Sequence, residues 1–409
     1  MYDLTTLREE FPVLSEVIYL DNAATTQTPI RAVEAMCDYF YEYAGNYGRG
    51  THQLARETTN RCEASRESLA SFLGAYPEQM IWTGNTTGAI NLVTQGLSFK
   101  RGDEVLCSAL EHHSNLLPWL SLKKKGVKIQ IIPQEAGYID PDTVSDLITH
   151  KTRVVAVSQM TNVTGTIQPV DAIADLIHDA GGLIVVDGAQ SVGHIPVDIS
   201  KMDYLAIAGH KGLLGPQGVG ALYAEEPETL ASSQFGGGTI VSVSFENVKY
   251  RPVPARLEPG TPNIPGIIGM GPAIRLVEEL GVDTIASHEE ALGTLIYDEL
   301  ECIDGISLYS PRGTPVVSFG ASGIHPDVVG IKLDDMASIC VRSGMHCAEP
   351  YTRTFCEQGT VRASVACYTS KEEILFFSDT LRELIETFDP SVEPVYEPEP
   401  DLWDKSKCP

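Results

Sequence analysis

The 409-residue sequence predicts an α/β protein, with a large domain built on a mostly parallel sheet and a smaller α+β domain. Short apolar runs alternate with helical stretches up to about residue 255, a pattern typical of a sheet covered by helices on both faces. Beyond residue 260, long helical runs precede a few short strands. The length also favours two domains, because single cores stop growing near roughly 250–300 residues.

The expected elements of the large domain follow in chain order. Residues 56–74 have polar and apolar faces at helical spacing and end at Gly74, which suits a helix C-terminus. Another strand is expected at 218–227, as the antiparallel edge strand that such sheets often carry. The other expected strands span residues 80–84, 104–110, 127–133, 153–160, 183–189 and 204–209.

The second half of the chain predicts the smaller domain. Helical runs at 265–303 lead to expected strands at 306–310, 315–319 and 338–342, and a final helix is expected over about 371–388. We therefore expect a large domain at 17–255 and a small domain made of 1–16 and 256–388. Residues 389–409 are acidic and rich in proline, which predicts a loose tail or a strap over the surface.

Composition narrows the class of function. The net charge of −26 opposes binding to nucleic acid, which depends on basic residues that neutralise phosphates. No apolar run reaches the roughly 18–20 residues of a membrane span, and the first residues resemble no export signal, so we expect a cytoplasmic protein. The nine cysteines form no CxxC pair and are expected to be free thiols, and we expect no metal site.

Two strand ends carry the most informative residues. One apolar run ends at Asp187, and the next is followed by Lys211 in a glycine-rich turn. Ligands of open α/β sheets bind beyond the carboxyl ends of strands, so both side chains are expected in one crevice. Pyridoxal phosphate needs such a pair, a lysine amine that bonds to its aldehyde and a carboxylate that keeps its ring nitrogen protonated. Taken alone, the pair also fits a surface lysine beside a strand-end carboxylate.

The neighbouring motifs settle that choice. From YLDNAATTQTP at 19–29 to VRASVACYTSKEEI at 361–374, nearly the whole chain resembles the class V aminotransferases, and within them the cysteine desulfurases of the SufS type. The resemblance implies the aspartate-aminotransferase-like fold (fold type I) of pyridoxal-phosphate enzymes. It also implies that Lys211 bonds to the cofactor, that Asp187 pairs with the ring nitrogen and that Gln190 reaches the phenolic oxygen.

The segment GNTTG places Thr86 and Thr87 at the start of a helix, where free N–H groups favour a phosphate. Without the resemblance, this pair would indicate only a helix N-cap. The family usually has serine where this chain has Ala208, two residues before His210. The residues implied to bind the cofactor are Thr86, Thr87, His112, Asn162, Asp187, Gln190, His210, Lys211 and Thr261.

Other implied roles concern catalysis and assembly. His112 is expected to stack on the ring and to pass protons, since the ordinary pKa of histidine lies near neutrality. The motif RLEPGTPN resembles a segment that crosses a dimer interface, so Thr261 is expected to contact the phosphate of the other subunit. A homodimer with shared active sites follows. The residues implied to bind the substrate are Ala23, His52, Asn162 and Arg362.

The motif VRSGMHCAEP supplies the expected nucleophile. It resembles the group II desulfurase motif, which implies that Cys347 receives the sulfur, although Met345 stands where the family usually has histidine. Arg362 suits a carboxylate because its planar fork donates two parallel hydrogen bonds. The default interpretations are a buried thiol for Cys347 and an ion pair for Arg362.

The expected reaction converts L-cysteine to L-alanine and leaves the sulfur as a persulfide on Cys347. A protein thiol or a small thiol then accepts the sulfur, and the expected purpose is iron–sulfur cluster assembly. Three alternatives stay open, namely a selenocysteine lyase, a class V aminotransferase in which Cys347 is incidental, and a non-catalytic scaffold for sulfur transfer.

Overall fold

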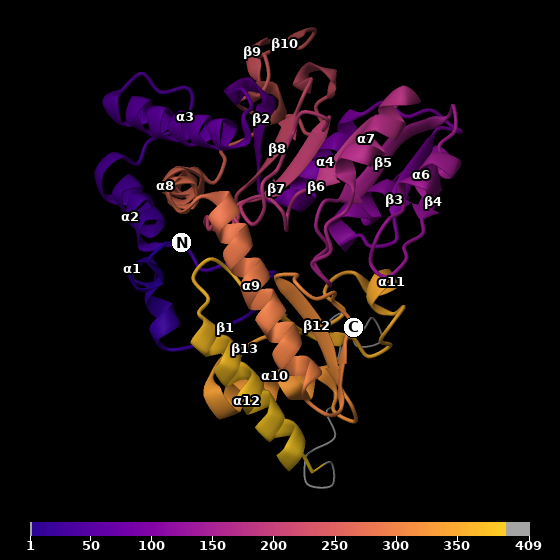
Figure 1. The fold of residues 1–409 in the computed structure, drawn as a ribbon. Helices are drawn as coiled ribbons and strands as arrows, with labels where there is room; N and C mark the ends of the chain where they lie inside the picture. The colour runs from indigo at the N-terminus through magenta and orange to yellow at the C-terminus, as the bar shows by residue number, and fades with distance from the viewer. Residues whose placement is uncertain (1, 390–409) are drawn as a thin grey trace, which may run out of the picture.

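The structure, a computed structural model, describes residues 2–389 (Figure 1). Apart from Asp389, the predicted acidic tail lies outside the described residues. A seven-stranded sheet with its helices forms the upper part of the view in Figure 1, and a four-stranded sheet with α9 and α12 forms the lower part.

The large sheet has the order β2-β8-β7-β6-β5-β3-β4. Neighbouring strands from β7 to β4 run parallel, whereas β8 is antiparallel to both β2 and β7. The prediction of an antiparallel strand at 218–227 is therefore confirmed, but its expected place at the edge is wrong, because β2 covers it. The strands are β2 (Met80–Thr83), β3 (Glu104–Ser108), β4 (Lys128–Ile132), β5 (Thr152–Ser158), β6 (Leu183–Asp187), β7 (Tyr204–Ala208) and β8 (Gly220–Ala224).

Continuous apolar strands allow this sheet to be buried on both faces. Val154 and Val185 pack in one apolar cluster, while their neighbours Val155 and Val186 pack in the other. α4 lies against β7 and β8, and α7 lies against β5 and β6. The helices of this part are α2 (Ile30–Asp38), α3 (Gln53–Leu73), α4 (Thr86–Gly96), α5 (Leu117–Ser121), α6 (Pro141–Leu147), α7 (Val170–Asp179) and α8 (Ile264–Leu280).

The second sheet is antiparallel, with the order β11-β12-β15-β14. The strand expected at 338–342 is divided into β13 and β14, and β13 pairs with β1 from the N-terminal region. The elements are α1 (Leu4–Arg8), β1 (Ile18–Tyr19), α9 (Val282–Glu301), β11 (Ile306–Leu308), β12 (Val316–Ala321), α10 (Pro326–Ala337), β13 (Ile339–Cys340), β14 (Arg342–Gly344), α11 (Glu349–Thr352), β15 (Thr360–Ser364) and α12 (Lys371–Thr387).

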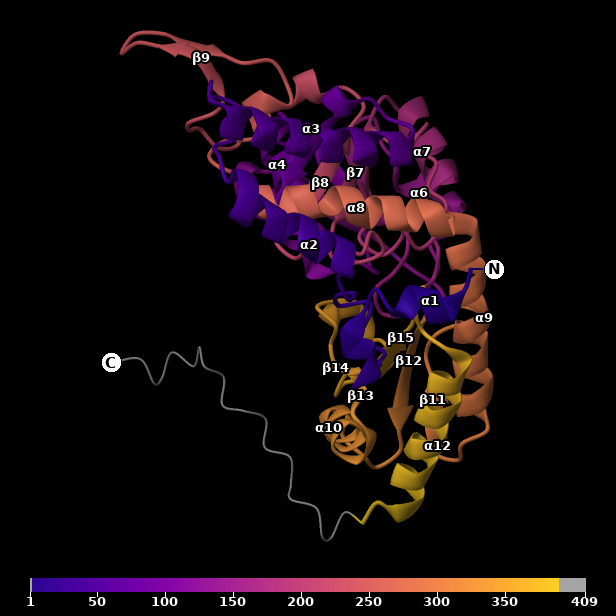
Figure 2. The same cartoon turned by 90° about the vertical axis from the view of Figure 1, so that its left-hand side faces the viewer.

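A hairpin of β9 (Ile240–Val243) and β10 (Val248–Tyr250) projects from the rest of the molecule (Figure 2). It carries exposed apolar side chains, including Val241, Val243 and Phe245. In residues 2–389, no helix is both long enough and apolar enough to cross a membrane. The same part of the chain has no group of three His, Cys, Asp or Glu side chains placed to hold a metal ion.

Candidate active site

A cavity of about 570 Å³ lies where the two sheets meet. It is lined by residues at the carboxyl ends of β5, β6 and β7, and also by residues of β14 and β15. The crevice predicted beyond the strand ends is therefore present. The cavity brings together eleven of the predicted site residues, Ala23, Thr86, Thr87, His112, Asn162, Asp187, Gln190, His210, Lys211, Cys347 and Arg362.

Lys211 and Asp187 reach this cavity from adjacent strands, as their positions in the sequence predicted. Burial lowers the pKa of Lys211 to about 8, although the carboxylate of Asp187 opposes the shift. Asp187 Oδ1 accepts a hydrogen bond from the Ala189 N–H at 2.9 Å. Burial raises the pKa of Asp187, while this N–H and the Lys211 ammonium act in the opposite direction. The two side chains therefore influence each other's pKa across the cavity.

The N-terminus of α4 faces the cavity with unused donors. Asn85, not a threonine, caps the helix, and its side chain accepts from the Gly88 N–H at 2.9 Å. Within the described part of the chain, the hydroxyl of Thr86 is buried without a hydrogen-bond partner, as is Nδ1 of His210. Thr87 Oγ1 lies 2.7 Å from the hydroxyl of Ser114. A helix N-terminus with two orphaned polar atoms fits a phosphate group.

Gln190 and Ala23 lie together at the cavity wall. Gln190 Nε2 donates to the carbonyl oxygen of Ala23 at 2.8 Å, and the Ala23 N–H donates to Ser364 Oγ at 2.8 Å. Both backbone groups of Ala23 are therefore engaged within the protein. Ala208, which stands where the family usually has serine, is buried and offers no polar atom from its side chain.

His112 is neutral in this environment. Burial, with Lys211 and other cations adding to the effect, lowers its pKa to about 4. Its Nδ1 accepts a hydrogen bond from the Ser114 N–H at 3.0 Å, so the proton of the neutral ring is on Nε2. The expectation that His112 titrates near neutrality used the ordinary pKa of histidine and did not include this burial.

Cys347 is exposed on a turn with an unusual backbone. Both His346 and Cys347 have a φ of +53°, in the left-handed region that costs most residues roughly 1–2 kcal/mol each. Three hydrogen bonds hold the turn. Asn162 Nδ2 donates to the His346 carbonyl at 2.7 Å, the His113 N–H donates to the Cys347 carbonyl at 2.7 Å, and the His346 ring pairs with Thr360 Oγ1 at 2.7 Å.

Arg362 projects into the cavity from β15. Its Nη1 donates to the carbonyl oxygen of Asn162 at 2.8 Å, and its Nη2 lies 3.4 Å from Asp21 Oδ1. Burial lowers the pKa of Arg362 to about 10, although Asp21 opposes the shift. The guanidinium is still charged at neutral pH, so the cavity presents a buried cation.

Two predicted residues lie outside the cavity in the single chain. His52 is exposed, and its Nδ1 caps α3 by accepting from the Ala55 N–H at 3.3 Å. Thr261 is also exposed and lines a separate hollow together with Arg49. The expectation that His52 lies near the site is thus not met within one chain, whereas Thr261 was expected to act on the other subunit.

Sequence reasoning missed two carboxylates near the cavity. Asp21 follows directly after a short apolar run, which was the available signal, and it meets Arg362. Glu111 is fully buried and accepts from the hydroxyl of Ser108, from Asn115 Nδ2 at 2.6 Å and from Ser158 Oγ at 2.6 Å. Burial raises the pKa of Glu111 to about 7 despite these bonds.

Known proteins share both this sequence and this fold. The class-V aminotransferase family matches residues 18–377. A probable cysteine desulfurase of Methanothermobacter thermautotrophicus is 39% identical over 391 residues, which cover 92% of this chain and 97% of that protein. A cysteine desulfurase structure from Thermococcus onnurineus NA1 has a TM-score of 0.91 at 40% identity, covering 95% of this chain and 99% of that one.

A cysteine desulfurase structure from Escherichia coli has a TM-score of 0.89 at 33% identity and covers 94% of this chain and 99% of that one. These likenesses confirm the predicted fold, in which a large mixed sheet of mostly parallel strands carries the site. The chain belongs to the class-V aminotransferase family.

Proposed function

We propose that this protein is a pyridoxal-phosphate-dependent cysteine desulfurase, which converts L-cysteine to L-alanine and keeps the sulfur as a persulfide on Cys347. The observation that carries the proposal is the convergence of Lys211, Asp187, Arg362 and Cys347 on one cavity. Relatives that align along almost their whole length are cysteine desulfurases by name.

The residues of the cavity fit the cofactor. The orphaned Thr86 hydroxyl and His210 Nδ1, with the N-terminus of α4, would hold the phosphate. Asp187 would face the ring nitrogen, and the Lys211 amine would bond to the aldehyde. The chemistry that bound pyridoxal phosphate supplies is an electron sink for negative charge at the α-carbon of an amino acid.

The chain's own groups would then orient the substrate. The Nε N–H of Arg362 is buried without a partner among the described residues and would donate to the α-carboxylate of L-cysteine. Lys211, whose pKa is about 8, has an appreciable fraction of neutral amine at neutral pH and would accept the α-proton. His112 is neutral and would donate a hydrogen bond through Nε2.

Cys347 would act as the nucleophile. Its thiolate attacks the substrate sulfur, so that a sulfur–sulfur bond forms and the carbon–sulfur bond breaks. The electron pair of the broken bond stays on carbon, which takes up a proton. In sum, L-cysteine and the Cys347 thiol become L-alanine and a Cys347 persulfide, with no outside oxidant or reductant.

The finer assignments belong to the same proposal. The motif of Arg342, Gly344, His346 and Cys347 supports a SufS-type, group II enzyme. The sulfur would pass to a protein thiol or a small thiol for iron–sulfur cluster assembly. The eight cysteines in the described residues are free, as suits a reducing cytoplasm.

A homodimer with shared active sites is also part of the proposal. Thr261 lies outside the cavity of its own chain, and the projecting hairpin exposes Val241, Val243 and Phe245. Exposed apolar groups of this kind favour an interface with another chain. Contact with a second copy would cover the hairpin and bring Thr261 to the other subunit's phosphate end.

The test is turnover of L-cysteine by the purified protein with pyridoxal phosphate. We expect a visible absorbance change on adding L-cysteine, release of alanine and a persulfide that mass spectrometry locates on Cys347. Lys211→Ala should lack alanine release and the persulfide. A keto acid in place of alanine would support the aminotransferase, turnover of selenocysteine alone would support the lyase, and no cofactor binding would support the scaffold.

A further inference from the structure

The hydrogen-bond donors of Arg362 are unevenly occupied. Nη1 donates to Asn162 at 2.8 Å, Nη2 lies at the longer distance of 3.4 Å from Asp21, and Nε has no hydrogen-bond partner within residues 2–389. The edge formed by Nε and Nη2 is the one that binds a carboxylate through two parallel bonds. An arriving carboxylate would therefore share Nη2 with Asp21.

The position of Asp21 is fixed by its backbone. It forms a bridge with Ser364 on β15, and the Ser364 N–H donates to the Leu20 carbonyl at 2.7 Å. The carbonyl of Asp21 itself accepts from the Ala24 N–H at 3.1 Å. Its side chain is 16% exposed, against 3% for that of Arg362. Asp21 is therefore held beside a buried cation that needs a counter-charge.

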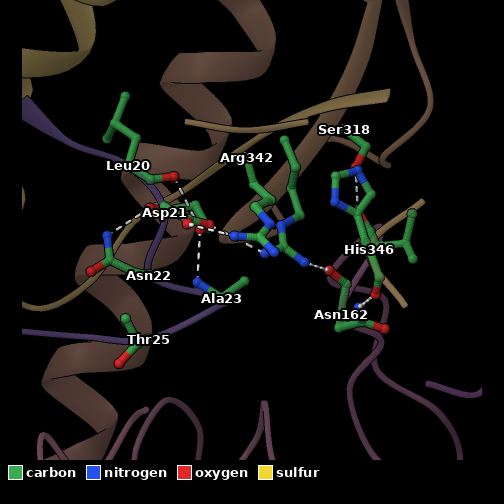
Figure 3. A network of polar contacts seen from close by, with 12 residues as sticks. Leu20, Asp21, Asn22, Ala23, Thr25, Asn162, Ser318, Arg342 and His346 are labelled. Carbon is green, nitrogen blue, oxygen red and sulfur yellow. Dashed lines mark hydrogen bonds and ion pairs between the residues drawn. The ribbon is translucent and has the colours of Figure 1, made fainter. Parts of the chain in front are cut away.

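A second arginine faces the same carboxylate. Arg342 and Arg362 are paired across β14 and β15, and Arg342 Nη1 lies 3.9 Å from Asp21 Oδ2. Figure 3 shows Asp21 and Arg342 turned toward each other, with Asn162 on the opposite side of Arg342 from Asp21. Two cations and one anion leave a positive charge that one further carboxylate balances.

We propose that Asp21 is a positioning residue that acts through Arg362. It fixes the Arg362 guanidinium when no amino acid is bound, and it lowers the affinity of that guanidinium for a bound carboxylate. This inference rests on the proposed function, because it takes Arg362 as the partner of the substrate carboxylate. L-cysteine and L-alanine carry the same α-carboxylate, so a stronger bond to Arg362 would retain the product as well as the substrate. Competition from Asp21 keeps the release of alanine fast.

A purely structural ion pair makes a different prediction. If Asp21 only stabilises the fold, Asp21→Asn lowers the melting temperature by the same amount with and without a ligand. If Asp21 competes with the ligand, L-alanine raises the melting temperature of Asp21→Asn more than that of the wild type, because binding stabilises in proportion to affinity.

The experiment compares wild-type and Asp21→Asn holoenzyme. The dissociation constant of L-alanine is measured from the visible absorbance of the cofactor, and melting temperatures are recorded with and without L-alanine. We expect Asp21→Asn to bind L-alanine roughly tenfold more tightly, the scale of one hydrogen bond to a charged group. The KM for L-cysteine should also fall. An unchanged or weaker affinity for L-alanine overturns the proposal.

Matched variants separate the possible failures. Asp298→Asn removes the carboxylate of an exposed ion pair with Arg312 on the surface and should leave L-alanine binding unchanged. If Arg362→Gln still binds L-alanine normally, the carboxylate assignment of the proposed function fails. If Arg362→Gln loses binding but Asp21→Asn does not gain it, only the role of Asp21 fails. Asp21→Ser, a smaller neutral variant with the same expected direction, serves if Asp21→Asn does not fold.

Discussion

Burial sets the charge states of the residues around the cavity. It lowers the pKa of Lys211 to about 8 and those of His112 and His210 to about 4. At neutral pH both histidines are therefore neutral, while the lysine is divided between ammonium and amine. Because of this difference in pKa, Lys211 can act as a base, whereas the two neutral histidines act as hydrogen-bond donors and acceptors.

The pKa of Lys211 predicts how apoenzyme takes up its cofactor. Only the neutral amine attacks an aldehyde, so the uptake rate should rise with pH and level off above pH 8, well before the 10.5 expected of an exposed lysine. The rate is measured by borohydride trapping of pyridoxal phosphate on Lys211 between pH 6 and 11. A rate that keeps rising through pH 10 would contradict the low pKa.

Cys347→Ser separates binding from sulfur transfer. The variant should bind the cofactor and L-cysteine normally, because the Lys211, Asp187 and Arg362 side chains are unchanged. Alanine and persulfide formation should fall by at least about a thousandfold, more than 4 kcal/mol of barrier, since a hydroxyl is a poor nucleophile at neutral pH.

Alanine release and the persulfide are measured together. Cys302→Ser, which changes an exposed cysteine at the end of α9, is the control and should retain full activity. Unchanged desulfuration by Cys347→Ser would show that its thiol is not the sulfur acceptor. Retained turnover of selenocysteine with loss of cysteine turnover would favour the lyase.

The sequence indicated those site residues that follow strands. Asp187 and Lys211 could be predicted because parallel strands bring their carboxyl ends together. Asp21 also follows a short apolar run, but its contact with Arg362 joins segments far apart in the chain, and so does the contact of Glu111 with Ser158. The sequence alone does not reveal such contacts. The low pKa of His112 could not be predicted either, since burial is a property of the folded molecule.

At the scale of elements, the turn between β14 and α11 has a strained backbone that neighbouring elements stabilise. His346 and Cys347 both adopt left-handed backbone conformations, and the neighbouring loop and β15 supply the bonds that fix them. Strain of this kind persists only where the surrounding structure determines it. The turn therefore depends on partners that lie outside the cysteine motif.

Thr360→Val tests that dependence. The substitution keeps the shape of the side chain but leaves the buried His346 ring without the Thr360 hydroxyl, 2.7 Å from its Nε2. The free energy of unfolding should fall by about 1–3 kcal/mol, the cost of leaving a buried polar group unpaired. Sulfur transfer should slow while cofactor binding is retained.

Chemical denaturation and alanine release are the measurements. Thr387→Val is the control, because Thr387 is exposed and its hydroxyl bonds mainly to Glu383 one turn earlier at 2.7 Å. Equal stability losses in the two variants would show that the His346 contact contributes nothing specific.

Most strands could be predicted because the apolar runs that form them are buried on both faces. The order of the strands could not be predicted, because an apolar run does not show which strands lie beside it. The strand expected at the edge of the sheet, β8, lies between β2 and β7. The β9–β10 hairpin was not predicted, because its exposed apolar residues do not alternate with a buried face. α10, which follows His325 and includes Gly330, lacked a clear helical pattern.

At the scale of the whole molecule, the division into domains stays a prediction. β1 pairs with β13, and Leu20 packs in the apolar cluster of the four-stranded sheet. The segment after residue 17, which was expected to begin the large domain, therefore contacts the smaller part. The cavity is lined from both parts, since Lys211 comes from one and Cys347 from the other.

The proposed dimer is tested by mixing two inactive variants. Lys211→Ala removes the lysine of its own site, and Thr261→Ala would damage the phosphate end of the other subunit's site. In a mixed dimer, one site would carry both defects and the other none. Random mixing in equal amounts should restore about one quarter of wild-type activity, because half of the dimers are mixed and each has one intact site.

The measurement is alanine release after the two variants are unfolded together and refolded, with each variant refolded alone as its control. A dimer is needed for any recovery, so the mass of the refolded species is determined in the same samples. If Thr261 instead acts within its own chain, every site keeps one defect and mixing gives no more than the average of the two controls. Recovery without dimer formation would equally contradict the shared site, because a single chain would then hold every group that the reaction needs.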